Sequence, residues 1–224
     1  MTWISRVLLS VLLTATFTGV GGYLRAANNP PVNPSGEAQY SLTIRIYDYA
    51  GVSERILSQA QAEAAEIYQR IGVNTTWLRC TSDPDEMRNH PCNNVRGTQV
   101  LGLQLLPNSM EPKEGLPNGI FGFALLPPDG RPGSYAKIYS DNVSKLADGR
   151  VYRESAVLGH MLAHEIGHLL LGIGSHSRSG LMKIPWGPKE LTLADRGGLS
   201  FSKKEIRRIA KNLELRAEKD EASD

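Results

Sequence analysis

The chain has almost no excess of charge of either sign. Its 25 lysine and arginine residues face 23 aspartate and glutamate residues, a net charge of +2 over 224 residues. A nucleic-acid-binding protein needs a basic patch or stripe to hold the phosphate backbone, so this balance argues against a nucleic-acid partner. Internal repeats are also missing, which excludes a repeat array. The length suits one core, or a domain with tails, and we expect a monomer.

Long apolar runs are rare as well. Only residues 7–24 are apolar nearly throughout, and they follow a lightly basic start at Met1–Arg6. This order is typical of a signal peptide, while about 18 residues is near the lower limit for a membrane span. We therefore predict that residues 1–27 are a signal peptide or a signal anchor. The protein would be secreted, periplasmic or otherwise in the cell envelope, or else attached to a membrane through residues 7–24.

Proline and charge patterns bound a single folded domain over residues 40–218. Residues 28–39 contain three prolines, which indicates a linker rather than a folded segment. The acidic end of the chain, residues 219–224, is expected to be a disordered tail. The domain would therefore begin at the first segment with clear periodicity.

Hydrophobic periodicity predicts an α/β (α+β) fold with a five-stranded, mixed, twisted sheet. Leu42, Ile44 and Ile46 alternate as in a strand, and a helix capped by Ser53 follows. A second strand after this helix would lie parallel to the first in a right-handed crossover. The expected strands are 40–47, 73–79, 98–106, 120–126 and 133–140, with a buried helix around 156–171 and a C-terminal helix after Ser202. Residues 80–97 and 191–199 are expected to be loops, and the lysines and arginines of the C-terminal helix to form a solvated face.

Cysteine is scarce, with only Cys80 and Cys92 in the chain. A lone pair flanking a short polar segment in an exported protein indicates a disulfide. Closing so short a loop stabilises the fold by roughly 2–3 kcal/mol in the chain-entropy model.

The most informative stretch is His164-Glu165-Ile166-Gly167-His168, an H-E-x-x-H pattern. On a helix, residues four apart lie on one face, so His164 and His168 can bind one Zn²⁺ through neutral imidazole nitrogens. Zinc lowers the pKa of water to about 7, and Glu165 is placed to take a proton from that water as a general base. The neighbouring residues are apolar nearly all round the helix. Burying two histidines and a glutamate there is costly unless a metal compensates them.

A catalytic zinc needs a third protein ligand. His176 follows Gly172 and Gly174, two glycines that allow the chain to reverse after the helix. Glu190 is the alternative, because some zinc enzymes take the third ligand from a later glutamate. His160 is one turn before His164, but three ligands on one straight helix would span about 12 Å, so we expect it to pack against the site instead.

The run from His164 to His176, H-E-I-G-H-L-L-L-G-I-G-S-H, resembles the metzincin clan of zinc peptidases, whose signature is H-E-x-x-H-x-x-G-x-x-H. Here the glycine, Gly172, stands one residue later and the third histidine two residues later. The following Met182 resembles the methionine that this clan places in a tight turn under the metal. The order of histidine, methionine and Pro185 is closest to the matrixin branch.

This resemblance implies a zinc-dependent endopeptidase that acts on a peptide or protein substrate. It also implies that His164, His168 and His176 are ligands, that Met182 is an apolar floor, and that the fourth strand is an antiparallel sheet edge above a cleft. A cysteine that caps the zinc, as in matrixin propeptides, is the alternative use of the thiols, but the N-terminal tail contains none. The alternative function is a non-catalytic, zinc-containing binding module of the cell envelope.

Overall fold

The computed structural model describes residues 39–110, 120–129, 131–147 and 151–222. The predicted signal segment, 1–27, and residues 28–38 of the predicted linker lie outside them. Within the described ranges, no helix has both the length and the apolar character that crossing a membrane requires.

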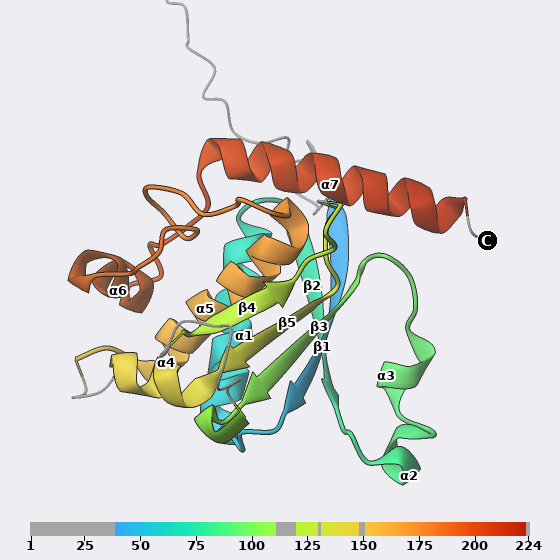
Figure 1. Cartoon of the computed structure of the whole chain (residues 1–224), viewed down its shortest axis with the longest axis horizontal. Coiled ribbons are helices and arrows are strands. Elements are labelled where there is room, and N and C mark those ends of the chain that lie inside the picture. Colours follow the sequence, from blue (N-terminus) through green and yellow to red (C-terminus); the bar gives the residue numbers. More distant parts are fainter. Residues whose placement is uncertain (1–38, 111–119, 130, 148–150, 223–224) are drawn as a thin grey trace, which may run out of the picture.

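A five-stranded mixed sheet forms the centre of the molecule, with the strand order β2-β1-β3-β5-β4 (Figure 1). Strands β1, β2, β3 and β5 run parallel, and β4 pairs antiparallel with β5 at the edge. This confirms the predicted mixed sheet and its antiparallel fourth strand. The strands span β1 Tyr40–Asp48, β2 Val73–Cys80, β3 Val100–Leu106, β4 Gly122–Leu125 and β5 Tyr135–Tyr139.

The first crossover follows the predicted local chemistry. Helix α1 (Glu54–Gln69) begins where the Ser53 hydroxyl accepts a hydrogen bond from the Ile56 amide, which satisfies one of the unpaired donors of the first turn. Gly72 then takes a φ of 80°, a conformation that costs glycine little. The chain can therefore turn directly into β2.

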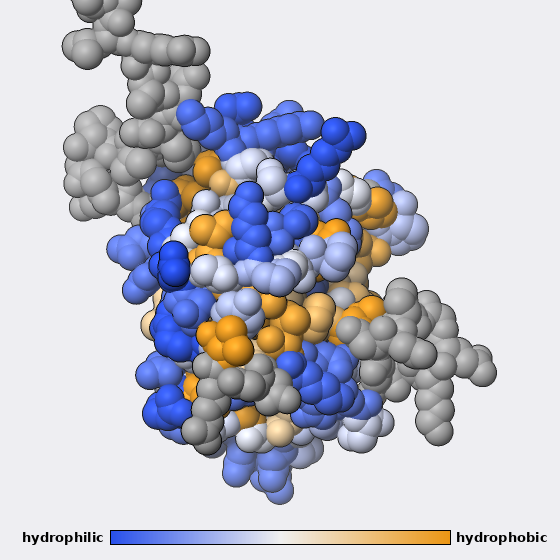
Figure 2. Space-filling model, turned by 90° about the vertical axis from the view of Figure 1, so that its left-hand side faces the viewer, coloured by the Kyte–Doolittle hydropathy of each residue, from blue (hydrophilic) through white to orange (hydrophobic). Residues whose placement is uncertain are grey.

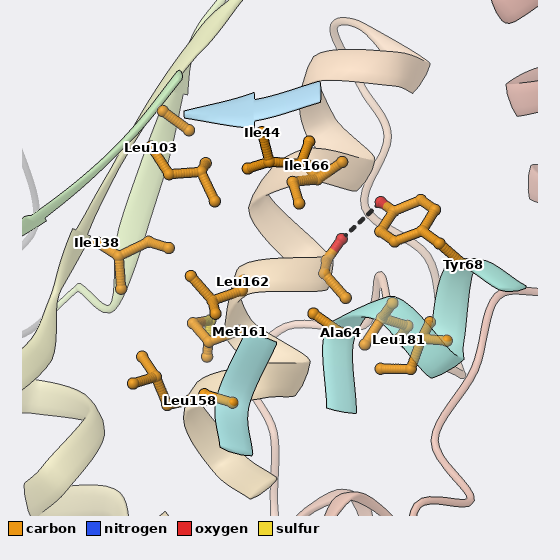
Figure 3. Packing of buried hydrophobic residues seen from close by; sticks show 14 of the residues in the cluster. Ile44, Ala64, Tyr68, Leu103, Ile138, Leu158, Met161, Leu162, Ile166 and Leu181 are labelled. Carbon is orange, nitrogen blue, oxygen red and sulfur yellow. Dashed lines mark hydrogen bonds between the residues drawn. The ribbon is translucent and has the colours of Figure 1, made fainter. Parts of the chain in front are cut away.

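Helix α5 (Glu154–Leu171) packs beside α1 against one face of the sheet. All its residues except Glu154 and His168 are buried, as its continuous apolar sequence predicts. Figure 3 shows this core: Leu158, Leu162 and Ile166 of α5 meet side chains from the sheet and from α1. The Tyr68 hydroxyl of α1 donates a 2.9 Å hydrogen bond to the carbonyl of Ala163. The backbone just before His164 is thus held by a side chain of α1.

Several segments expected to be strand or loop are helical. Helix α4 (Ser140–Ala147) begins where the fifth strand was expected to end, and its Val143 and Ala147 are buried one turn apart. The expected loop 80–97 contains the short helices α2 (Pro84–Met87) and α3 (Pro91–Asn94). A 3₁₀ turn, η1, covers Asn108–Met110.

The expectation of a loop over 191–199 is wrong for its first half, because α6 covers Pro188–Asp195. Pro188 occupies the first turn, where a missing N–H costs nothing, and the Glu190 carboxylate accepts a hydrogen bond from the Gly187 amide at 3.0 Å. Leu191 and Ala194 are buried. Local capping and a short apolar contact therefore suffice for a helix whose periodicity is weak.

The C-terminal helix α7 (Lys203–Glu221) has the predicted capping box, with Ser202 and Glu205 bonded to each other's amides at 3.3 and 2.6 Å. It extends into residues 219–221, where a disordered tail was expected. Its basic residues do not all face solvent either, because Arg216 is only 6% exposed. The helix lies across the end of the molecule where α5 finishes (Figure 1).

Candidate metal centre

Helix α5 places His164 and His168 one turn apart on the same face. Their Nε2 atoms lie 3.0 Å from each other. The rings meet edge to face, with centroids 4.6 Å apart. The helical spacing of the H-E-x-x-H pattern therefore brings two nitrogens to one point, as predicted.

The chain reverses after α5 and brings His176 to the same point. Gly172, with a φ of 77°, ends the helix and donates its N–H to the His168 carbonyl at 2.9 Å. Gly174 also has a positive φ, of 69°. The His176 ring then lies 4.7 Å from that of His168 and 5.7 Å from that of His164. One nitrogen from each of the three histidines falls within 4.8 Å of the others, a spacing that can hold a metal ion.

The outer nitrogens of the two helical histidines are held by neighbours. His164 Nδ1 donates to the Leu181 carbonyl at 2.8 Å, and because a carbonyl only accepts, Nδ1 carries the proton of the neutral ring. His168 Nδ1 lies 2.6 Å from the Ser175 hydroxyl, which can accept in the same way. Both Nε2 lone pairs then face one another. Such a pair repels unless a cation lies between, so the arrangement fits a bound metal.

The surroundings also keep these rings in the form that binds metal. Burial, with smaller contributions from the nearby histidines, lowers the pKa of His164 to about 4 and that of His168 to about 3. Both rings are therefore neutral at pH 7. Metal ligation requires the neutral imidazole.

Glu165 follows His164 in the sequence, and its carboxyl group lies beside Gly122 of β4. It is 3% exposed, and its Oε2 atom is buried without a hydrogen-bond partner. Burial raises the pKa of the Glu165 carboxyl to about 8 in the metal-free chain. Its Oε1 lies only 2.7 Å from where a Cβ on Gly122 of β4 would stand. With that pKa the group is mostly the neutral carboxyl at pH 7, and a nearby cation would favour the ionised carboxylate.

These side chains open onto a cavity of about 660 Å³ between α5 and the sheet edge. Glu165 and the three histidines lie on its wall, together with Gly172. The rest of the lining is mainly apolar and comes from β4 and its flanks, from Met161, from residues 173–175 and from the segment around Pro185. Figure 2 shows hydrophobic side chains gathered in the middle of one face, with hydrophilic residues around them.

Met182 lies against α5 rather than on the cavity wall. It is fully buried, and its sulfur stands 2.7 Å from where a Cβ on Gly167 would be. The absence of a side chain at Gly167 thus lets the thioether pack directly on the helix, between the two histidines in sequence. Trp186 packs edge to face on His164, with ring centroids 5.9 Å apart. An apolar layer therefore supports the ligand candidates.

The two alternatives raised by the sequence are not part of this group. Glu190 caps α6 and pairs with Lys183 Nζ at 2.7 Å. His160 is fully buried, with Nδ1 hydrogen-bonded to the Ala156 carbonyl at 2.8 Å. Its position one turn before His164 leaves it a packed histidine, as expected.

Three contributors to the site were not predicted. Ser175 orients His168, the Leu181 carbonyl orients His164, and Gly122 makes room for the Glu165 carboxylate. For these three contributors, the sequence offered one signal, a serine with a hydrogen-bonding side chain directly before His176. A backbone carbonyl and an absent side chain give no residue-type signal, because their role depends on which segments the fold brings together.

Comparisons with known proteins do not assign the chain to a family. No protein-family model and no curated protein sequence matches the chain. Among solved structures, it is similar to archaemetzincin from Methanopyrus kandleri, with 18% identity and a TM-score of 0.45, over 82% of this chain and 99% of that one. It is also similar to metalloproteinase-II from Bacteroides fragilis, with 14% identity and a TM-score of 0.43, over 82% of this chain and 59% of that one. At these values the site must be judged on the side chains of this chain alone.

Proposed function

We propose that this protein is a zinc-dependent endopeptidase of the metzincin-like type. The observation that carries the proposal is the convergence of three histidine nitrogens within 4.8 Å, on the same cavity wall as the unpartnered Glu165 carboxylate. His164, His168 and His176 would hold the zinc ion. A purely structural metal would not need a buried, unpaired carboxylate beside it, which favours an enzyme over a binding module.

The geometry suggests a role for the bound metal and for each residue of the site. Bound zinc supplies Lewis-acid chemistry, because it lowers the pKa of water to about 7 and polarises a carbonyl oxygen. Glu165 takes a proton from the attacking water and passes it to the leaving amine. Leu181 and Ser175 hold the imidazoles in the orientation that presents Nε2. Met182 and Gly172 act indirectly, as a packing floor and as the turn that brings in His176.

The sheet edge suggests how a substrate binds. Strand β4 is the last strand of the sheet and lines the cavity through Gly122, Phe123 and Ala124. An extended peptide can add to such an edge as a further strand, with main-chain hydrogen bonds for affinity and side-chain pockets for specificity. The scissile bond would then pass in front of Glu165. The apolar lining favours substrates with a large apolar side chain next to that bond.

The proposed location is outside the cytoplasm. Cys80 and Cys92 are joined, with their Cα atoms 5.9 Å apart, which confirms the predicted disulfide. Disulfides persist in oxidising compartments and are rare in the cytosol. The bond therefore supports export by the proposed signal segment, 1–27, with attachment through 7–24 as the alternative.

Glu165→Gln tests the reaction. The variant should bind zinc as the parent does but lose about 10²–10⁴-fold or more in kcat, because it keeps the shape of the side chain and removes the base. Turnover is measured on a mixed peptide library, and zinc content on the same samples. Cleavage at the parent rate would disprove the general-base role. A parent that binds zinc but cleaves nothing in the library would favour the binding module.

His176→Ala and Glu190→Ala test the third ligand. The first should weaken zinc strongly and abolish turnover, because it removes one of the three converging nitrogens. The second removes the α6 cap and the pair with Lys183, and should lower the melting temperature while leaving zinc affinity nearly unchanged. Chelator competition measures both affinities. The reverse pattern would make Glu190 the ligand.

A further inference from the structure

The end of α5 carries carbonyl groups that the helix itself cannot satisfy. The last four carbonyls of any α-helix have no amide partner within the helix. In α5 the first of them, at His168, accepts from the Gly172 amide. The carbonyls of Leu169, Leu170 and Leu171 need partners from elsewhere.

All three partners come from one face of α7. Arg208 Nη2 donates to the Leu171 carbonyl at 2.8 Å, Asn212 Nδ2 to that of Leu170 at 2.6 Å, and Arg216 Nη2 to that of Leu169 at 3.2 Å. The donors are spaced four residues apart, so they form one row along α7. As the residue number rises along α7, the bonded carbonyl lies one residue earlier in α5 each time.

From this row we propose that Arg208, Asn212 and Arg216 are positioning residues, and that α7 is an intramolecular clamp for the metal centre. The proposal rests on the function proposed above. The clamped turn contains His168 and leads directly into Gly172, where the chain reverses toward His176. Loosening that turn lets two of the three ligands drift from the first. The two arginines also place positive charge at the negative end of the helix dipole, which stabilises the closed turn.

Arg216 joins the clamp to the sheet. It also donates to the carbonyl of Gly133 at 2.5 Å and to that of Thr98, just before β5 and β3 respectively. Thr98 returns two bonds, from its hydroxyl to the Arg216 carbonyl at 2.7 Å and from its amide to Asp220 at 2.7 Å. A buried guanidinium is costly unless its donors are used, and here both Nη groups donate, which ties α5 to two strands. The last turn of α5 is therefore held relative to the same sheet that carries β4.

The clamp is tested with the full chain and with Zn²⁺ and Co²⁺ as the bound ions. Arg208→Met and Asn212→Leu remove the donors but keep the size of the side chains, singly and together. Arg208→Lys keeps a charge and a donor. Arg207→Met is the matched control, because Arg207 is exposed and adjacent in sequence. Zinc affinity is measured by chelator competition, ligand geometry by the Co²⁺ absorption spectrum, and the α5 turn by hydrogen exchange without metal.

The double variant should bind zinc about tenfold more weakly, as is typical when residues supporting a metal ligand are removed. Its Co²⁺ spectrum should change, and amides of residues 168–176 should exchange faster in the metal-free protein. Arg208→Lys should recover part of the affinity, and Arg207→Met should match the parent. Variants that lose only thermal stability, with parent affinity and spectrum, would overturn the clamp.

The comparison of metal binding by the parent and by the variants separates the two proposals. If the parent chain binds neither Zn²⁺ nor Co²⁺, both the proposed function and the proposed clamp are refuted. If the parent binds zinc and the variants bind it equally well, the clamp is refuted and the proposed enzyme function is unaffected. A single variant that fails to fold is replaced by Arg208→Lys, which keeps a donor at the same carbonyl.

Discussion

At the scale of single residues, the position of the Glu165 carboxylate depends on the absence of a side chain at Gly122. A Cβ on Gly122 would stand 2.7 Å from Glu165 Oε1 and 2.6 Å from the Lys137 carbonyl. Gly122→Ala should therefore push the carboxylate aside and lower kcat by about 100-fold, because a shift of about 1 Å in a reacting group has that effect. Zinc affinity should stay near the parent value, since the histidines do not touch Gly122. Steady-state kinetics and chelator competition measure the two effects.

Gly198→Ala is the control for that substitution. A Cβ there would meet its nearest neighbours at 3.6 Å, an ordinary contact. Its kcat should match the parent value. Equal losses of kcat in both variants would mean that Gly122 has no special relation to Glu165.

At the scale of elements, the sequence predicted those whose signal is local and strong. The alternation of Leu42, Ile44 and Ile46 and the cap at Ser53 correspond to β1 and α1 as observed. The H-E-x-x-H helix was equally plain, because its spacing and its continuous apolar surroundings point the same way. Helices α4 and α6 were missed for the opposite reason. Each is short and is stabilised by packing against α5, and α6 also by its cap, which periodicity over a few residues cannot show.

The contacts between elements were the least predictable part of the site. The C-terminal helix was expected, yet its arginines were expected to face solvent, because a basic residue on an amphipathic helix usually does. Arg208 and Arg216 instead bond the end of α5, more than thirty residues away in the chain. Such pairings are fixed by the relative placement of two helices. They leave no mark in either helix alone beyond a polar residue every fourth position.

At the scale of the whole molecule, the disulfide and the proposed metal centre should be independent. The loop closed by Cys80 and Cys92 contains α2 and ends within α3, and both helices lie well apart from α5 and β4 (Figure 1). Closing a loop of 12 residues stabilises the fold by about 3 kcal/mol through the entropy of the unfolded chain. That effect acts on the unfolded state and does not depend on contacts with the site.

Replacing both cysteines by alanine should therefore lower the free energy of unfolding by about 3 kcal/mol, while zinc affinity and kcat stay at their parent values. Alanine is preferred to serine because Cys92 is fully buried, and a hydroxyl there would add a desolvation cost of its own. Urea unfolding measures the stability, and the reduced parent serves as the comparison without substitution. Unreduced, unfolded parent should show no free thiol on titration. A matching fall in zinc affinity would mean that the end of β2 at Cys80 is coupled to α5 through the sheet. The disulfide loop and the metal site would then not be independent.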